Sequence, residues 1–293
     1  MNHATSLRVT LRATAIGFTA VLMWATLAFL TKLSGPIPPF QLTAIAFTLA
    51  SLIGLALWLK EGNSLHTYLK LPLPVWLTGI GGLFGYHFFY FIALQNAPAV
   101  EASLIAYLWP LLIVLLSACL PDERLSWRHG LGAIAGFLGA GLLVTNGKGL
   151  SFDPEFLSGY LAALVCAFTW STYSVLSRKF GAVPTSAVGG FCAVTAVLAW
   201  VCHALLETSV WPNWGQWGAI LPLGLGPIGL AFYTWDYGVK HGNIKALGAL
   251  SYLAPLLSTL LLIATGFATP SWALAWACLL IVGGAILASG DLT

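Results

Sequence analysis

The stretch Tyr-Leu-Trp-Pro-Leu-Leu at residues 107–112 returns as Tyr-Leu-Ala-Pro-Leu-Leu at residues 252–257, 145 positions later. Each copy lies in a long apolar run, where the proline removes a backbone N–H and frees a carbonyl one turn earlier. Apolar helices share Leu and Ala by composition alone, so the matched Tyr and Pro carry the comparison. The recurrence indicates an internal repeat that divides the 293-residue chain into two halves.

Other distinctive residues recur in nearly the same register. The matched pairs are Trp24/Trp170, Thr26/Thr172, Leu30/Leu176, Gly35/Gly181, Pro38/Pro184, Gly79/Gly224, Gly81/Gly226 and Gly139-Ala140/Gly284-Ala285. Aligned Trp, Tyr, Gly and Pro across four helix pairs are difficult to attribute to composition. We therefore predict two repeated units, residues 1–147 and 148–293.

The composition is that of a membrane protein. Apolar residues make up 59% of the chain and charged residues 7%, and the mean hydropathy is +0.89; an ordinary soluble domain is about a quarter charged. A membrane helix needs roughly 20 apolar residues. The sequence predicts an all-α polytopic fold with ten spans, near residues 13–31, 40–59, 75–94, 101–120, 129–146, 156–177, 184–206, 215–237, 246–265 and 271–289.

The cations are distributed unequally between the two sides of the membrane. Lys and Arg favour cytoplasmic loops. With a cytoplasmic N-terminus, ten cations fall inside and only Lys32 and Lys148 outside; the ten are Arg8, Arg12, Lys60, Lys70, Arg124, Arg128, Arg178, Lys179, Lys240 and Lys245. This asymmetry supports ten spans and predicts that both termini are cytoplasmic. Five spans per half is an odd number, so the two repeats are expected to be inverted relative to each other.

Inverted repeats point to a carrier. Two related halves can exchange conformations around one site near the midplane, which is the basis of alternating access. The sequence has no HExxH or GxSxG motif and no nucleotide-binding segment, so an enzyme or an ATP-driven pump is not expected. No ring of charges favours a channel. The net charge of +3 is too small to indicate nucleic acid as a partner.

The five cysteines lie in apolar stretches without CxxC spacing, and they are Cys119, Cys166, Cys192, Cys202 and Cys278. We interpret them as small buried residues, and expect neither disulfides nor a metal or other cofactor. Gly224-Leu-Gly-Pro-Ile-Gly229 spells GxGxxG inside a predicted span, with no strand before it. It is therefore interpreted as a site of close helix approach and flexibility rather than as a nucleotide loop.

With these features the sequence resembles the drug/metabolite transporter superfamily, in its ten-helix EamA group. The resemblance covers nearly the whole chain and is carried by the 5+5 arrangement, the W-x-T-x(3)-L helices at Trp24 and Trp170, and the repeated Tyr-Leu-x-Pro-Leu-Leu segments. The aromatic-rich segments at residues 85–90 and 106–110 are similar to those of YddG-type exporters of aromatic amino acids. The resemblance implies a secondary transporter of the bacterial inner membrane.

Tryptophan and tyrosine near the span centres are the candidate substrate ligands, because an indole N–H or a hydroxyl in hydrocarbon needs a partner. In the third span, the side chains of Tyr86, His87 and Tyr90 share one helix face. The full candidate set is Trp24, Tyr86, His87, Tyr90, Tyr107, Trp109, Trp170 and Tyr252. Pro110 and Pro255 are expected to kink the fourth and ninth spans and to shape gates.

Ionisable groups at membrane depth are few. His87 and Asp236 are the candidates for proton coupling, since histidine titrates near neutral pH. Asp236 has a second interpretation as the partner of nearby Lys240 at the cytoplasmic end of the eighth span. The sequence does not choose between proton coupling and facilitated movement down the substrate gradient.

The central aromatic residues favour a flat apolar substrate with polar ends. Phe, Tyr and Trp fit this description, and other neutral amino acids are compatible with it. Many aromatic drugs and metabolites fit as well, so a broad drug or metabolite exporter is the alternative. The expected partners are this small-molecule substrate and the lipid bilayer. The chain is expected to function as a monomer, and the sequence leaves a dimer open.

Overall fold

The computed structural model describes residues 3–62, 70–121, 123, 125–150 and 152–289, and these residues form helices and connecting segments without a strand. Nine helical segments of this described part are long and apolar enough to cross a membrane, and a tenth apolar helix, Trp272–Ala288, is shorter. All ten coincide with the predicted spans. The chain is therefore an all-α, multi-pass membrane protein, as predicted.

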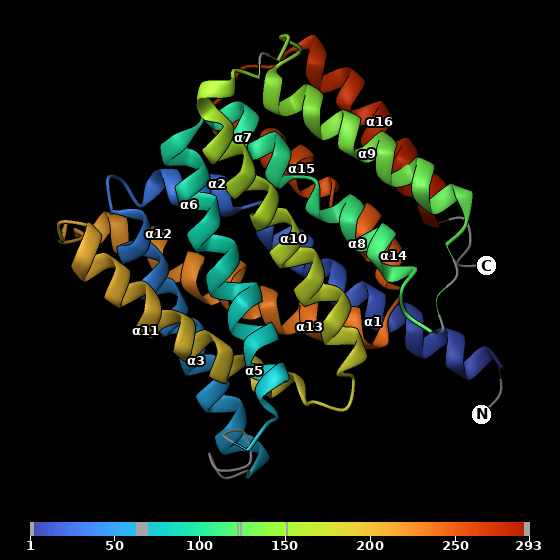
Figure 1. The fold of residues 1–293 in the computed structure, drawn as a ribbon, viewed down its shortest axis with the longest axis horizontal. Helices are drawn as coiled ribbons and strands as arrows, with labels where there is room; N and C mark the ends of the chain where they lie inside the picture. The colour runs from blue at the N-terminus through green and yellow to red at the C-terminus, as the bar shows by residue number, and fades with distance from the viewer. Residues whose placement is uncertain (1–2, 63–69, 122, 124, 151, 290–293) are drawn as a thin grey trace.

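Several spans consist of more than one helix (Figure 1). We number the spans 1 to 10 along the chain. They comprise, in order, α1 (His3–Trp24) with α2 (Leu27–Leu33); α3 (Pro39–Glu61); α5 (Leu73–Ile80), η1 (Gly81–Gly85) and α6 (Tyr86–Asn96); α7 (Ala99–Ala106) with α8 (Trp109–Ser117); α9 (Trp127–Thr145); η2 (Pro154–Phe156) with α10 (Leu157–Lys179); η3 (Thr185–Ala187) with α11 (Val188–Leu206); α12 (Trp214–Leu225), η4 (Gly226–Leu230) and α13 (Ala231–His241); α14 (Ile244–Leu250) with α15 (Leu253–Ala264); and α16 (Trp272–Ser289).

The interruptions of spans 3 and 8 lie at equivalent positions of the repeat. The elements η1 and η4 are single π-helical turns, and they begin at Gly81 and Gly226, 145 residues apart. Such turns shift the helix register and often mark functional sites. Spans 4 and 9 are also interrupted at matching places, where α8 begins with Trp109 and α15 with Leu253. Pro110 is the second residue of α8, and Pro255 is the third residue of α15.

The helix contacts show a pseudo-two-fold arrangement. In Figure 1, α9 lies alongside α16 and α3 alongside α11, and these two pairs flank the remaining helices. Among the inner spans, α1 packs against α13 and α10 packs against α6. Exchange of the two halves converts the span 1–span 8 pair into the span 6–span 3 pair, and leaves the 2–7 and 5–10 pairs as they are. This is the arrangement expected of inverted repeats.

Glycines permit the closest of these approaches. A Cβ atom on Gly189 of α11 would lie 2.6 Å from the Cα atom of Gly54 on α3 and 3.2 Å from the Tyr233 hydroxyl. Real Cβ atoms do not approach other atoms at the first of these distances. The span 2–span 7 pair is therefore built on direct backbone contact, which small residues allow in membrane bundles.

The two ends of the bundle are packed differently. The helices α6 and α13 are equivalent in the repeat, since residues 86–96 and 231–241 are 145 apart. Of their eleven residues each, α13 buries seven and α6 buries only Ala93. In α2, no residue is buried. The helix α13, at the end where α1 begins, is thus more tightly packed than α6 and α2 at the opposite end. We call these two ends the N-terminal end and the loosely packed end.

Charged residues hold the N-terminal end together. The Glu123 carboxylate accepts from Arg178 at 2.6 Å and from Lys245 at 2.9 Å. Arg178 also donates to the carbonyl oxygens of Val239 and Gly242, at 2.9 and 2.7 Å. We call these residues the N-terminal seal. They connect the segment after span 4 with the ends of spans 6 and 8 and the start of span 9.

One expectation about the cysteines is wrong. Cys166 and Cys192 are buried, but Cys119 is exposed and Cys202 and Cys278 are intermediate. In a membrane protein an apolar segment can turn outward to lipid, so an apolar sequence neighbourhood does not indicate burial within the protein.

The Gly54–Gly189 contact predicts a selective effect on stability. Gly189→Ala should lower the free energy of unfolding by about 1–3 kcal/mol, because the new methyl group forces α3 and α11 apart. The measurement is the melting temperature of the purified protein in detergent.

The matched control is Gly283→Ala, where a Cβ atom would meet nothing within 4 Å. It should keep or raise the melting temperature, since alanine favours the helix. Equal melting temperatures for the two variants would contradict the close-packing account.

Candidate binding site

Four tryptophans from both halves meet in the middle of the bundle. They are Trp24 at the end of α1, Trp109 on α8, Trp170 on α10 and Trp235 on α13. All six pairs are in contact, with ring centroids separated by 5.1 Å for Trp24–Trp235 up to 6.3 Å for Trp170–Trp235. Most cross edge to face, the arrangement that aromatic quadrupoles favour. We call these four residues the tryptophan cluster.

Phenylalanines extend the cluster on one side. Phe232 of α13 lies 6.4 Å from Trp24 and 5.6 Å from Trp170. It also stacks on Phe47 of α3 at 5.5 Å with nearly parallel rings. Since Phe232 and Phe47 are both buried, this stack forms a rigid apolar wall beside the indoles.

The four indole N–H groups are used differently. Trp24 donates to the carbonyl oxygen of Pro227 in η4 at 3.0 Å, and Trp235 donates to the Ser174 hydroxyl at 3.0 Å. The N–H groups of Trp109 and Trp170 have no hydrogen-bond partner among the described residues, and neither nitrogen belongs to the fully enclosed polar atoms. Both side chains are otherwise buried, with 7% and 4% of their surface exposed. Two indole donors are therefore available to a ligand.

His87 supplies an acceptor next to the cluster. Its ring packs edge to face on Phe47 at 5.2 Å and on Tyr86 at 5.4 Å. The His87 Nδ1 atom lies 2.8 Å from the Leu83 carbonyl oxygen, which can only accept, so Nδ1 carries a proton. In a neutral ring, Nε2 is then left as an acceptor.

Tyr86 and Tyr90 continue this face of α6. Their rings stack at 6.0 Å, and Tyr86 also reaches Trp170 at 5.7 Å. The Tyr90 hydroxyl shares a hydrogen bond of 3.1 Å with Ser103 on α7. The tyrosine face therefore leads from the tryptophan cluster toward the loosely packed end of the bundle.

The Tyr252 hydroxyl bridges the interruption of span 4. It donates to the Tyr107 carbonyl oxygen at 3.2 Å and accepts from the Leu111 N–H at 3.2 Å. These two groups would bond each other in an uninterrupted helix. Tyr252 is fully buried, and a Cβ atom on Gly136 would collide with its ring, lying 2.9 Å from the Tyr252 Cγ atom. Tyr252 thus has a structural role at the interruption of span 4 and lies outside the tryptophan cluster.

Asp236 lies in a buried ion pair. Its carboxylate accepts from Lys240 at 2.7 Å and from the Thr185 hydroxyl at 2.8 Å, and Lys240 also donates to the Val183 carbonyl oxygen at 2.9 Å. Both side chains of the pair are at most 3% exposed. The pair fastens span 8 to the segment between spans 6 and 7 at the N-terminal end.

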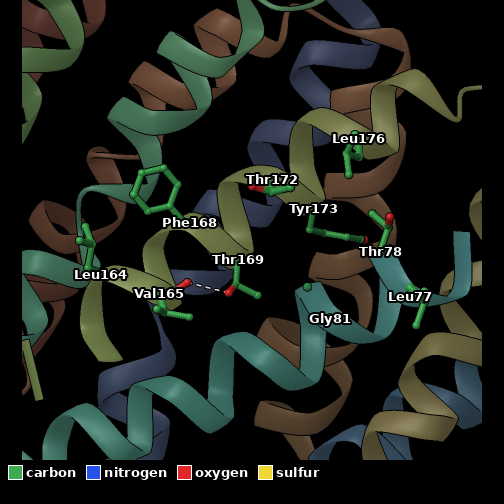
Figure 2. Close-up of a pocket in the computed structure, with 11 residues that line it drawn as sticks. Leu77, Thr78, Gly81, Leu164, Val165, Phe168, Thr169, Thr172, Tyr173 and Leu176 are labelled. Carbon is green, nitrogen blue, oxygen red and sulfur yellow. Dashed lines mark hydrogen bonds between the residues drawn. The ribbon is translucent and has the colours of Figure 1, made fainter. Parts of the chain in front are cut away.

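A separate groove of about 570 Å³ opens between span 3 and span 6. Figure 2 shows Leu77, Thr78 and Gly81 on one side of it and residues of α10 on the other. Its rim carries the exposed apolar side chains of Val165 and Phe168, as expected for a surface that faces lipid. Tyr173 separates the groove from the cluster, since its ring packs on Trp170 at 5.2 Å.

The structure brings most of the predicted ligands together. Ring contacts join Trp24, Tyr86, His87, Tyr90, Trp109 and Trp170 into one connected group. Tyr107 lies at the interruption of span 4, half-buried. Tyr252 and Asp236 lie outside this group, in the contacts described above.

Trp235 and Phe232 also belong to this connected group, although neither was among the predicted ligands. Both could have been found from the repeat, because an offset of 145 places Trp235 opposite Tyr90 and Phe232 opposite His87. An aromatic residue at a candidate ligand position in one half is a signal for its equivalent in the other.

Comparison with known proteins agrees with this architecture. Residues 11–145 and 157–290 each match the model of the EamA-like transporter family. An aromatic amino acid exporter YddG from Ancylobacter novellus is 57% identical over 278 residues, which cover 94% of this chain and 96% of that protein. The aromatic amino acid exporter YddG of Escherichia coli K12 is 24% identical and also covers 94% and 96%. A biotin transporter of Escherichia coli K12 is 24% identical, over 82% and 80%.

A solved crystal structure has the same fold. It is 56% identical to this chain and superposes with a TM-score of 0.90, covering 96% of this chain and 98% of the other.

The two hydrogen bonds of the Tyr252 hydroxyl predict that its removal destabilises the protein. Tyr252→Phe leaves the Tyr107 carbonyl and the Leu111 N–H unpaired in a buried place, which should lower the free energy of unfolding by about 1–3 kcal/mol. The readout is thermal unfolding in detergent.

Tyr237→Phe serves as the control, because Tyr237 contacts His241 through its ring at 4.8 Å. It should unfold like the wild type. Wild-type stability of Tyr252→Phe would show that its hydroxyl does not support the interrupted helix.

Proposed function

The chain belongs to the EamA-like transporter family, and on that premise we propose that it exports aromatic amino acids across the bacterial inner membrane by alternating access. The named function of the 57% identical relative supports this substrate class. The structural observation that carries the proposal is the pair of indole N–H groups, on Trp109 and Trp170, that have no partner among the described residues and lie among aromatic rings. Transporter relatives and the absence of a catalytic motif support a function other than catalysis.

An aromatic amino acid matches the enclosure group by group. Its carboxylate can accept from the N–H groups of Trp109 and Trp170, and such charge-assisted bonds are about twice as strong as neutral ones. Its ammonium can donate to Nε2 of His87. Its ring has Tyr86 and Phe232 beside it for edge-to-face or stacked contact. The described residues of this site carry no fixed charge, so a zwitterion suits it better than a strongly anionic molecule.

The α10–α6 and α1–α13 pairs, which are equivalent in the repeat, support the choice of rocking units. We propose that spans 3, 4 and 6 move as one bundle and spans 8, 9 and 1 as the other, against the 2–7 and 5–10 pairs. The repeated units 1–147 and 148–293 then contribute equivalently to both bundles. Since one chain supplies every member of the cluster, a monomer is sufficient for transport.

The distribution of cations sets the proposed orientation. Arg178, Lys240 and Lys245 all lie at the N-terminal end, which the preference of Lys and Arg for cytoplasmic loops assigns to the cytoplasm together with both termini. The N-terminal seal then closes the cytoplasmic side, and the site faces outward. For an exporter this is the conformation that releases substrate.

A broad drug or metabolite exporter is the alternative function. The aromatic enclosure alone is compatible with it. The indole donors favour a ligand with a carboxylate, and this is the feature that separates the two proposals.

The site predicts both substrate selectivity and the residues that cause it. Proteoliposomes should take up radiolabelled Phe, Tyr and Trp in preference to Leu and Glu. Trp109→Phe and Trp170→Phe should each raise the KM for Phe roughly tenfold or more, because each variant loses one hydrogen bond to a charged group.

Trp200→Phe is the control, since Trp200 is an exposed residue of α11 whose N–H lies 3.4 Å from the Thr48 hydroxyl. It should transport normally. Uptake of aromatic drugs without amino acids would favour the broad exporter, and unchanged KM values in both cluster variants would refute the site.

His87 is the proposed group for proton coupling, because its ring lies beside the cluster in contact with Tyr86 and Phe232, whereas Asp236 is held by Lys240. An imposed pH gradient should stimulate Phe uptake by the wild type, and His87→Gln should abolish the stimulation while leaving gradient-free uptake measurable. The measurement is initial uptake with and without the gradient. An unstimulated wild type would indicate facilitated transport, and stimulation that survives in His87→Gln would exclude His87.

A further inference from the structure

Trp24 and Trp170 are equivalent residues of the inverted repeat. They are 146 positions apart, each followed by Thr, Leu, Gly and Pro at matching places. Each lies in the first span of its half and within the tryptophan cluster, where their rings are 5.6 Å apart. A structure with perfect two-fold symmetry would give their N–H groups identical partners.

Their hydrogen bonds differ. Trp24 donates to the Pro227 carbonyl oxygen in the π turn of span 8. The equivalent of Pro227 is Gly82, 145 positions earlier, in the π turn of span 3. Trp170 does not donate to Gly82 or to any other described residue. One member of the pair is therefore latched to a π turn, and the other offers its N–H to a ligand.

We propose that Trp24 and Trp170 exchange these roles between the two conformations of the carrier. In the opposite conformation, the Trp170 N–H donates to the Gly82 carbonyl oxygen and the Trp24 N–H is released to bind the substrate carboxylate. The inference rests on the proposed alternating access. It assigns a second form of the binding site, in which Trp24 replaces Trp170 as a ligand.

The surroundings of the two residues permit this exchange. Trp24 is enclosed here by Trp109, Trp170, Phe232 and Trp235. Their equivalents, which would enclose Trp170, are Ala254, Trp24, His87 and Tyr90. Three of these four are aromatic, and His87 and Tyr90 lie on the helix that already contacts Trp170 through Tyr86. The acceptor and most of the enclosure thus exist in duplicate.

The tyrosine pair fails the same test. Tyr252 fits against Gly136, whereas the position equivalent to Gly136 is Ile281, a buried residue of α16. The other half therefore offers the Tyr107 ring no space equivalent to the one that Gly136 leaves for Tyr252. The exchange is assigned to the tryptophans, and the Tyr252 bridge is expected in both conformations.

Trp109 provides a constant donor. Its equivalent is Ala254, so no second residue can take over its N–H. During the exchange one indole donor stays in place while the other changes identity. A substrate carboxylate would keep one hydrogen bond throughout the transition, which avoids the cost of a fully unpaired charge at membrane depth.

Distances across the loosely packed end, measured without substrate, test the exchange. Spin labels at the exposed residues Gln95 and Thr265, in a background without the native cysteines, report separation of the two bundles by double electron–electron resonance. Trp24→Phe removes the latch of the present conformation and should increase the short-distance population roughly two- to tenfold, the effect of one net hydrogen bond.

The direction of the distance shift in the double variant Trp24→Phe/Trp170→Phe is the decisive result. Trp170→Phe removes the latch of the opposite conformation, so adding it to Trp24→Phe should return the distribution toward that of the wild type. Trp200→Phe should change nothing. The proposal is overturned if Trp24→Phe leaves the distances unchanged, or if the double variant stays at the distribution of Trp24→Phe or moves further.

A second variant removes the donor without changing the shape of the ring. Benzothienylalanine at position 24 replaces the indole N–H by sulfur, and it should reproduce the shift even if Trp24→Phe folds poorly. Because no substrate is present, failure of these shifts would refute the exchange and leave the uptake results untouched. A failed uptake panel with the shifts observed would instead refute the substrate assignment.

Discussion

A backbone N–H or carbonyl cannot remain bare in hydrocarbon, and this constraint governs the centre of the molecule. Spans 3, 4, 8 and 9 are interrupted near their middles, and interrupted helices expose polar groups that need partners. Side chains from other spans provide some of them. The Trp24 N–H bonds the Pro227 carbonyl, and the Tyr252 hydroxyl bridges Tyr107 and Leu111. Within the described part of the chain, the indole N–H groups of Trp109 and Trp170 have no such partner, and they form the proposed site.

The charges of the chain have two functions in this account. In the proposed orientation, residues such as Arg178, Lys240 and Lys245 lie on the cytoplasmic side, which Lys and Arg prefer. The same cations bond Glu123, Asp236 and backbone carbonyls between the spans at the N-terminal end. At the opposite end, the residue equivalent to Arg178 in the repeat is Lys32. Its ammonium group lies over the Phe267 ring, 4.2 Å from the ring centroid. The two ends therefore differ in chemistry although the helices are repeated.

The sequence was sufficient for the fold because its strongest signals are long-range and redundant. Ten apolar runs, the bias of the cations and the repeated Tyr, Trp and Pro each lead to the same architecture. The tryptophan cluster was predicted in part, since Trp24, Trp109 and Trp170 were identifiable from their central positions. The π turns at Gly81 and Gly226 were not, because a π turn has no distinctive sequence. Helix register decides which of the indole N–H groups are hydrogen-bonded, and the sequence does not show it. Tyr252 has its structural role only because Gly136, on another span, leaves room for its ring.

A structure determined with phenylalanine bound would test the central claim most directly. We predict that the carboxylate lies within hydrogen-bond distance of the indole nitrogens of Trp109 and Trp170, with the ammonium toward His87 and the ring beside Tyr86 and Phe232. Phenylalanine bound in the lipid-facing groove between spans 3 and 6, or bound in the cluster with its carboxylate directed away from both indoles, would contradict the account.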